Sequence, residues 1–133
     1  MRRLLVAHNV IDDARRPCGT PLSIPHAWAL LELRQSGPLT IKALAARLNI
    51  DRTNVSRLCA RMTKLKEIKR AAHPDDKRAQ LVALTRRGEQ LANMVDTAST
   101  AHFSKVLDRL EGEVAPLIES LDHLTAALST GAE

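Results

Sequence analysis

The sequence predicts a mainly α-helical protein with one small β-hairpin, on three observations. Apolar residues recur at helical spacing along most of the 133 residues. Residues 68–72 and 78–84 depart from that spacing because they alternate or run apolar as strands do, and the HPDDK segment at 73–77 between them has the composition of a turn. The length suits one compact domain, so we expect residues 1–133 to form a single domain.

Two helices are predicted before the middle of the chain. The first covers residues 2–16 and ends before Pro17, which interrupts helices. Its apolar face comprises Leu4, Leu5, His8 and Ile11. The second begins at Ser23, accommodates Pro25 in its first turn and stops at Gly37.

Residues 40–62, TIKALAARLNIDRTNVSRLCARM, predict two short helices joined by a tight turn. Thr40 is expected to cap the first helix and Asp51 the second, which should cover residues 52–66. Asn49 stands at the turn, where a left-handed backbone is often needed and Asn tolerates it well. The apolar positions would form a small shared core of Leu44, Leu48, Val55, Leu58 and Met62. This arrangement is a helix-turn-helix.

The polar face of the second motif helix carries groups suited to DNA. A helix of this size fits the major groove of B-DNA, and Arg and Asn side chains offer the donors and acceptors that distinguish base edges. Arg57 and Asn54 are therefore the candidates for base reading. The candidates for phosphate contacts are Arg52, Thr53, Ser56 and Arg61, with Thr40 as a further DNA-contacting residue. The alternative is that these are ordinary solvated positions on a surface helix.

The charge is concentrated on the same part of the chain. Residues 52–87 contain eleven Lys or Arg and three Asp or Glu, a net charge of +8, whereas residues 88–133 carry −6. A basic middle and an acidic end indicate that one part of the molecule faces a polyanion. Trp28 and Phe103 are the only aromatic residues besides histidines, so stacking platforms for single strands are lacking and double-stranded DNA is the expected partner.

A long helix is predicted to begin at Arg86, capped by Thr85, and to break near Gly112 before helix resumes around Glu113. From Phe103 onward its apolar residues alternate in steps of three and four, which favours packing against another helix. The helix of residues 2–16 together with a second copy of the protein is the most economical partner. The predicted homodimer interface comprises Leu4, Leu5, Ile11, Leu110, Val114, Leu117, Leu121, Leu124 and Leu128.

Other classes of function are weakly indicated. The chain has no P-loop, G-x-G-x-x-G, H-E-x-x-H or nucleophile-elbow pattern, and its five histidines are scattered, so no enzyme activity, cofactor or metal site is predicted. No apolar run is long enough to span a bilayer and the start of the chain lacks a signal-peptide pattern, so we expect a cytoplasmic protein without a membrane partner.

The two cysteines, Cys18 and Cys59, give no disulfide framework. Cys59 falls on the apolar side of the second motif helix, as a small core residue would. Cys18 follows Arg15 and Arg16, whose charges could lower the pKa of its thiol enough for peroxide sensing. A redox-sensing regulator that uses Cys18 is therefore one alternative.

The order of elements resembles the MarR family of bacterial transcription regulators, which are winged-helix homodimers. Three segments carry the resemblance, which extends over nearly the whole chain: GPLTIKALAARLNIDRTNVSRLCARM, the wing sequence HPDDKRAQLVAL, and LTRRGEQL. In the wing, Asp76 and Arg78 occupy the family's Asp-x-Arg positions, and the third segment matches the junction from wing to helix through Leu84, Thr85 and Gly88. The resemblance implies a winged helix-turn-helix fold.

The resemblance also assigns parts of the chain. It implies dimerisation helices at 1–22 and 103–133, with a winged-helix DNA-binding lobe and a long connecting helix at 23–102. Arg78, flanked by Lys77 and His73, would reach into a minor groove, whose negative potential attracts a guanidinium. Asp76 would brace the wing, although a turn residue bonded to its own backbone is an equal alternative.

Two further expectations follow from the family pattern. Lys66 and Glu67 stand where the family usually has a small residue followed by an apolar one, so the exit from the second motif helix is expected to differ. A cavity between the dimerisation helices and the DNA-binding lobe, near His26 and Trp28, is the expected place for a small-molecule effector.

Taken together, the sequence predicts a sequence-specific, double-stranded DNA-binding transcription regulator. Repression through an inverted-repeat operator, bound by a homodimer with half-sites about one helical turn apart, is the favoured mode. The other alternative is a winged-helix module that binds a protein and no DNA.

Overall fold

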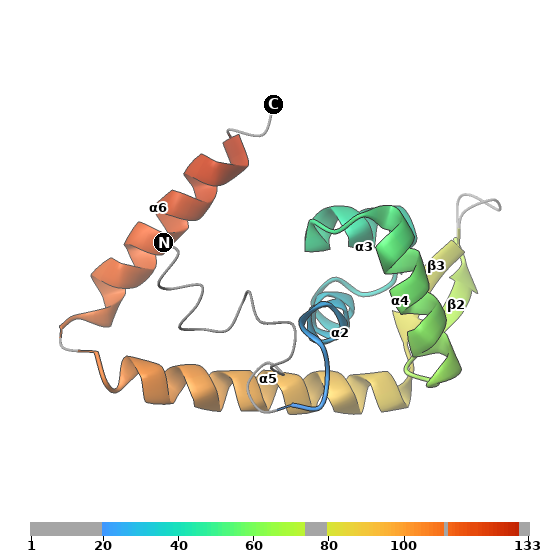
Figure 1. Cartoon of the computed structure of the whole chain (residues 1–133), viewed down its shortest axis with the longest axis horizontal. Coiled ribbons are helices and arrows are strands. Elements are labelled where there is room, and N and C mark those ends of the chain that lie inside the picture. The colour runs from blue at the N-terminus through green and yellow to red at the C-terminus, as the bar shows by residue number, and fades with distance from the viewer. Residues whose placement is uncertain (1–19, 74–79, 111, 131–133) are drawn as a thin grey trace. The chain divides into compact units, whose positions relative to one another are not determined.

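The computed structural model describes residues 20–73, 80–110 and 112–130 (Figure 1). It divides into two compact units, Met1–Ser99 and Thr100–Glu133, which are described separately below. Several predictions lie outside the described residues, namely the helix at 2–16, the cysteine at position 18 and the tip of the wing at 74–79.

Helix α2 (Ile24–Ser36) begins and ends where the sequence predicts. Ser23 is its N-cap, and Pro25 lies in the first turn. Backbone N–H groups in the first turn have no acceptor within the helix, so proline costs no hydrogen bond there. Gly37 ends it at a φ of 74°, a conformation that glycine adopts readily. The helix buries Ala29, Leu30 and Leu33 in the core.

Helices α3 (Ile41–Leu48) and α4 (Arg52–Lys64) form the predicted helix-turn-helix. Asn49 adopts the left-handed conformation expected of it, with φ 51° and ψ 43°. The backbone N–H of Asn49 donates to the last carbonyls of α3, which closes that helix. The predicted end of the second helix near residue 66 was too late, because Lys66 is left-handed (φ 59°) and cannot continue a right-handed helix.

A three-stranded antiparallel sheet lies beside these helices, with strand order β1-β3-β2. Strand β2 (Ile68–Ala72) matches the prediction, and β3 (Gln80–Leu84) covers the described part of the second predicted strand. The sequence did not predict β1 (Leu39–Thr40), which pairs with Val82 and Leu81 of β3. Two residues are too few to show a strand period, so only the tertiary pairing reveals this strand.

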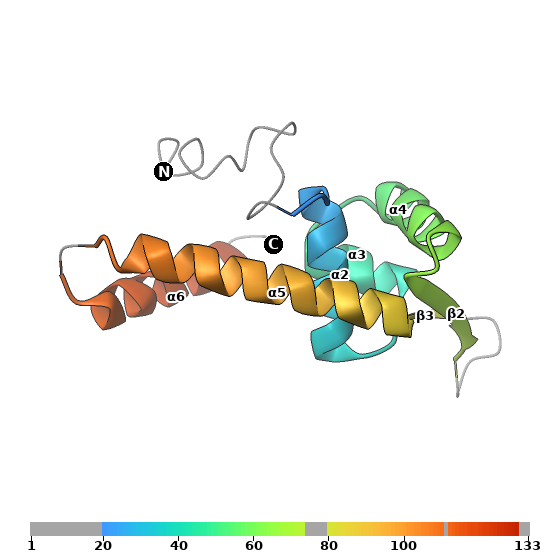
Figure 2. The ribbon, with the colours of Figure 1, turned by 90° about the horizontal axis from the view of Figure 1, so that it is seen from below.

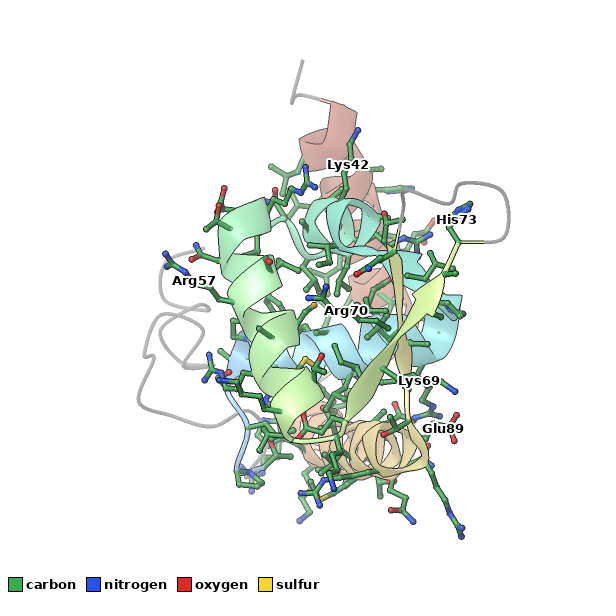
Figure 3. All side chains as sticks on the ribbon, turned by 90° about the vertical axis from the view of Figure 1, so that its right-hand side faces the viewer. Lys42, Arg57, Lys69, Arg70, His73 and Glu89 are labelled. Atoms are coloured by element: carbon green, nitrogen blue, oxygen red, sulfur yellow. The ribbon has the colours of Figure 1, made fainter. Side chains whose placement is uncertain are left out.

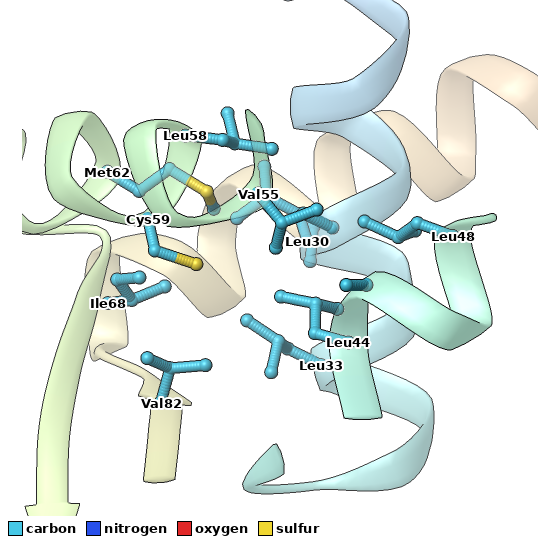
Figure 4. Close-up of a cluster of buried hydrophobic side chains, with 13 residues drawn as sticks. Leu30, Leu33, Leu44, Leu48, Val55, Leu58, Cys59, Met62, Ile68 and Val82 are labelled. Atoms are coloured by element: carbon cyan, nitrogen blue, oxygen red, sulfur yellow. The ribbon is translucent and has the colours of Figure 1, made fainter. Parts of the chain in front are cut away.

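The core of the first unit is built between α2, α3, α4 and the sheet (Figure 4). All five residues predicted to pack within the motif are buried, and side chains of α2 and the two long strands join them; these are Leu30, Leu33, Ile68 and Val82. Cys59 is 1% exposed, and burial raises the pKa of its thiol, as expected of a core cysteine. The helix-turn-helix is thus fixed against the rest of the unit by its apolar face.

Two helices carry the chain onward. Helix α5 (Arg86–Leu107) starts at the predicted residue but ends five residues before Gly112, and α6 (Val114–Thr130) begins one residue after the predicted restart. Gly112 itself has a φ of 131°, consistent with a break at that position. None of the described helices is both long and apolar enough to span a membrane.

Most of the predicted interface residues of this second part are exposed in the single chain. Val114 is half-buried, and the exposed ones are Leu110, Leu117, Leu121, Leu124 and Leu128. The predicted partners Leu4, Leu5 and Ile11 lie outside the described residues.

Candidate nucleic-acid interface

Helix α4 has one buried face and one polar exposed face, and its start is held by a side-chain cap. The carboxylate of Asp51 accepts hydrogen bonds from the backbone N–H groups of Thr53, at 2.8 Å, and Asn54, at 3.3 Å. These bonds fix the first turn, from which the polar side chains project. Caps of this kind are local, which is why the sequence alone predicted this one.

The side chains proposed for DNA contact lie on the exposed face of α4. Arg52, Thr53, Asn54, Arg57 and Arg61 are all exposed, and Ser56 is half-buried. Val55, Leu58, Cys59 and Met62 occupy the opposite face and are buried. Because the apolar face is committed to the core, the polar face is the one that an external partner can meet.

Figure 3 shows basic side chains from three elements on the same side of the first unit: Arg57 projects from α4, Lys42 from α3 and His73 from the end of β2. Arg70 lies between α4 and the strands, where its guanidinium donates to Gln80 Oε1 at 2.8 Å. Figure 2 shows α4 and the strands β2 and β3 at the same end of this unit. The polar face of α4 and the basic hairpin therefore lie at the same end of the first unit.

Lys42 and Arg70 were missed by the sequence interpretation. Lys69 and Arg70 are adjacent in a strand, so their side chains point to opposite faces, and the sequence does not say which of them faces α4. The available signal was only the excess of positive charge in this region. In the sheet Arg70 pairs with Val82 of β3, and its side chain is the one that faces α4 (Figure 3).

Other predicted positions have mixed outcomes. The Oγ1 atom of Thr40 accepts a hydrogen bond from Ala43 N at 3.1 Å, which confirms its role as a cap. His73 is half-buried and directly follows β2. Asp76, Lys77 and Arg78 lie outside the described residues.

The exit of α4 has a regular helix-ending motif in spite of the unusual sequence there. Glu67 N donates to Met62 O at 3.0 Å and Lys66 N donates to Thr63 O at 3.0 Å, the two bonds of a Schellman motif. The left-handed position of this motif usually holds glycine, and here it holds Lys66. The expected alteration of the exit is thus confined to the residue type, and the backbone course is regular.

The exit is also tied to the start of α5. Thr85 N donates to Glu67 O at 2.9 Å, and the hydroxyl of Thr85 lies 2.6 Å from Lys66 O and 3.0 Å from Glu67 O. The same hydroxyl oxygen accepts from Gly88 N at 3.2 Å, which makes Thr85 the predicted cap of α5. The junction thus links α4, the sheet and α5.

The two candidate effector residues differ in their exposure. Trp28 is 47% exposed and lies at an open cavity of about 240 Å³, which is lined by Trp28, Leu31, Glu32, Gln35, Arg47 and Leu48. His26 is buried instead, with its Nε2 atom 2.6 Å from Oε2 of Glu67. Within the described residues, this cavity is lined by Trp28 and not by His26.

The cavity beside Trp28 contains a polar network between α2 and α3. Arg47 Nη1 donates to Glu32 Oε1 at 2.7 Å and to Ser36 Oγ at 2.6 Å, and Ser36 Oγ donates to Glu32 Oε1 at 2.7 Å. The bond from Ser36 and then the contact with Arg47 hold the pKa of the Glu32 carboxyl below its ordinary value, against a smaller opposing effect of burial. Among the described residues, no group of three or more His, Cys, Asp or Glu side chains is arranged to hold a metal ion.

These features define a class of protein: a winged helix-turn-helix transcription regulator. The family model that matches this chain, over residues 20–79, is that of the MarR family. The match covers α2, the helix-turn-helix and β2, so this part of the chain is similar to the MarR family.

Known proteins agree with that assignment. An HTH-type transcriptional regulator of Mycobacterium tuberculosis is 28% identical over 109 residues, which cover 82% of this chain and 76% of the relative. The crystal structure of RV1404 from the same organism is 26% identical, with a TM-score of 0.72 over 96% of this chain and 86% of that one. FabT of Streptococcus pneumoniae, solved in complex with DNA, is 18% identical and shares the fold, with a TM-score of 0.74 over 97% of this chain and 90% of that one. The first of these relatives is named as a transcriptional regulator.

Proposed function

We propose that this protein regulates transcription by binding a specific double-stranded DNA site as a homodimer. The observation that carries the proposal is the division of α4 into a buried apolar face and an exposed polar face that stands beside a basic hairpin. FabT, which has a similar fold, was solved in complex with DNA. The similarity of residues 20–79 to the MarR family supports the same conclusion.

In this proposal α4 enters the major groove. Arg57 and Asn54 read base edges, because their side chains can make paired hydrogen bonds to guanine and adenine respectively. Phosphate contacts, which fix orientation, come from Arg52, Thr53, Ser56 and Arg61, with Thr40 and Arg70 at the sides. In the wing, His73, Lys77 and Arg78 face the minor groove, and Asp76 stabilises the hairpin.

The homodimer is proposed on the exposed apolar residues of the second unit. Leu117, Leu121 and Leu124 are each at least 40% exposed in the single chain, at spacings that place them on one side of α6. An exposed apolar row of this kind favours packing against another helix. The same helix of a second copy of the protein would provide that partner. A two-fold dimer would bind an inverted repeat with half-sites about 34–36 Å apart, and repression by excluding polymerase is the proposed outcome.

A small-molecule effector would act by favouring a dimer geometry that fits the operator poorly. The open cavity beside Trp28 is the proposed location, because it combines an exposed aromatic ring with the charged pair Glu32–Arg47.

The experiment is selection of binding sites from a randomised DNA pool, followed by titration of the selected and a scrambled duplex at several salt concentrations. We expect enrichment of an inverted repeat, salt-sensitive binding, and a loss of about 5- to 100-fold in affinity for the selected site with Arg57→Ala. Arg109→Ala, which removes an exposed cation of the second unit, is the control and should bind almost as tightly as the native protein. If the native protein enriches no sequence and binds no duplex at low salt, the protein-interaction alternative replaces this proposal.

A further inference from the structure

A buried polar pair, His26 and Glu67, links the first turn of α2 to the exit of α4. His26 and Glu67 are 41 residues apart in sequence, and their Nε2 and Oε2 atoms are 2.6 Å apart. The residues are only 6% and 3% exposed, so this contact is sheltered from water. Neither side chain is on the DNA-facing surface described above.

Burying such a pair needs a reason other than stability. Taking a carboxylate out of water is costly, and two apolar side chains of similar volume usually stabilise a core as well or better. A pair of this kind fixes relative position, because a short hydrogen bond is directional. Apolar contacts, in contrast, allow the two elements to slide past each other.

The place of Glu67 in the fold shows what the pair would orient. The N–H group of Glu67 donates to Met62 O in α4, and its carbonyl accepts from Thr85 N at the start of α5. The next residue, Ile68, begins β2, which leads to the wing. Glu67 is therefore bonded to α4 and to the start of α5 through its backbone, and to α2 through its side chain.

We infer that His26 is a positioning residue for DNA recognition: by binding the Glu67 carboxylate, it fixes the end of α4 and the start of β2 relative to α2. The inference rests on the proposed function. Base reading requires α4 and the wing to keep their relative position and orientation closely. Phosphate contacts by long side chains tolerate small shifts. Loss of the pair therefore reduces discrimination between DNA sequences more than it reduces affinity for DNA in general.

The decisive variant is His26→Leu/Glu67→Met, which replaces both polar side chains with apolar ones of similar volume. It leaves no buried carboxylate without a partner, so it should fold and melt within a few degrees of the native protein. His26→Gln is the conservative variant, because its amide nitrogen can occupy nearly the position of Nε2 and donate to Glu67. Asp96→Asn is the matched control, since Asp96 also pairs with α2, through Arg34 at 3.1 Å, but on the exposed surface.

The readout is the ratio of affinities for the selected duplex and the scrambled duplex. We expect the double variant to lose at least tenfold in this ratio while its affinity for scrambled DNA changes less than threefold. His26→Gln should restore most of the ratio, and Asp96→Asn should leave it unchanged. A folded double variant with the native ratio overturns the inference, and so does an equal loss of affinity for both duplexes. If the double variant does not fold, the pair serves stability and the inference is again overturned. Failure of the proposed function is distinct, because the native protein itself would then show no ratio above one.

Discussion

Gly88 lies directly against the backbone carbonyl of Glu67. A Cβ atom built on Gly88 would overlap that oxygen and would also come within 3.1 Å of the side chain of Leu84. The contact arises where Thr85 N and the hydroxyl of Thr85 bind the backbone of Lys66 and Glu67. The backbone of the first turn of α5 thus packs against the backbone that follows α4. Only a residue without a side chain fits at position 88.

Gly88→Ala should therefore lower the free energy of unfolding by about 2 kcal/mol, although alanine is the better helix former. The obstructing atom is a backbone oxygen held by two hydrogen bonds, so it cannot move aside as a flexible side chain would. Urea unfolding followed by circular dichroism measures the change. Gly37→Ala is a useful comparison, because that site has a positive φ but no atom within 4 Å of the added Cβ. A native-like Gly88→Ala protein would show that the helix can shift away from the exit.

Lys66→Gly should raise the free energy of unfolding by about 0.5 kcal/mol. A left-handed conformation costs a residue with a side chain about 1 kcal/mol or more, and part of this gain is offset by the greater freedom of glycine in the unfolded chain. Lys64→Gly is the matched control, since it removes the same charge two residues earlier but inside the helix, where it should destabilise by about 1 kcal/mol. Equal destabilisation by both substitutions would contradict the assigned turn geometry.

The Glu32 network should give a pH-dependent contribution to stability. Because the pKa of Glu32 is lowered in the folded protein, the contribution is present above the ordinary pKa of glutamate, about 4.3, and is lost as the pH falls through the folded value. Glu32→Gln should thus be less stable than the native protein near pH 7, by less than about 1 kcal/mol because Arg47 is half exposed, and the difference should vanish in acid. Unfolding curves across this pH range test the prediction.

Ser36→Ala gives a second test of the same network. The Ser36 hydroxyl makes the largest contribution to the lowered pKa of Glu32, so its removal should bring that pKa back toward the ordinary value. Titration of the Glu32 carboxyl by NMR would measure this. A Glu32 pKa at or above the ordinary value in the native protein would exclude the network in solution.

Leu117→Asp combined with Leu121→Asp should convert a dimer into monomers, as measured by sedimentation. Both side chains are exposed in the single chain and lie one turn apart, so charges there would be buried in a helix-to-helix interface. Ser120→Asp is the control, because Ser120 is an exposed polar residue of the same helix and bonds locally to Pro116 O at 2.8 Å. An unchanged dimer in the double variant would place the interface elsewhere.

The sequence by itself determined the local parts of this protein. The caps at Thr40, Asp51 and Thr85 and the left-handed Asn49 were predictable, because each depends on bonds to residues within three or four positions. The polar and apolar faces of α4 followed from helical spacing in the same way.

The tertiary structure decided what depends on distant partners. Strand β1 exists only because Val82 and Leu81 lie beside it, and the choice of Arg70 over Lys69 depends on the sheet. His26 is bonded to Glu67, which lies 41 positions away in the sequence. Glycine is required at position 88 because the backbone carbonyl of Glu67, which follows α4, lies where a Cβ atom would be. Spacing along a chain encodes faces and turns, but the identity of a buried polar partner or a close backbone contact is fixed only when separate elements pack.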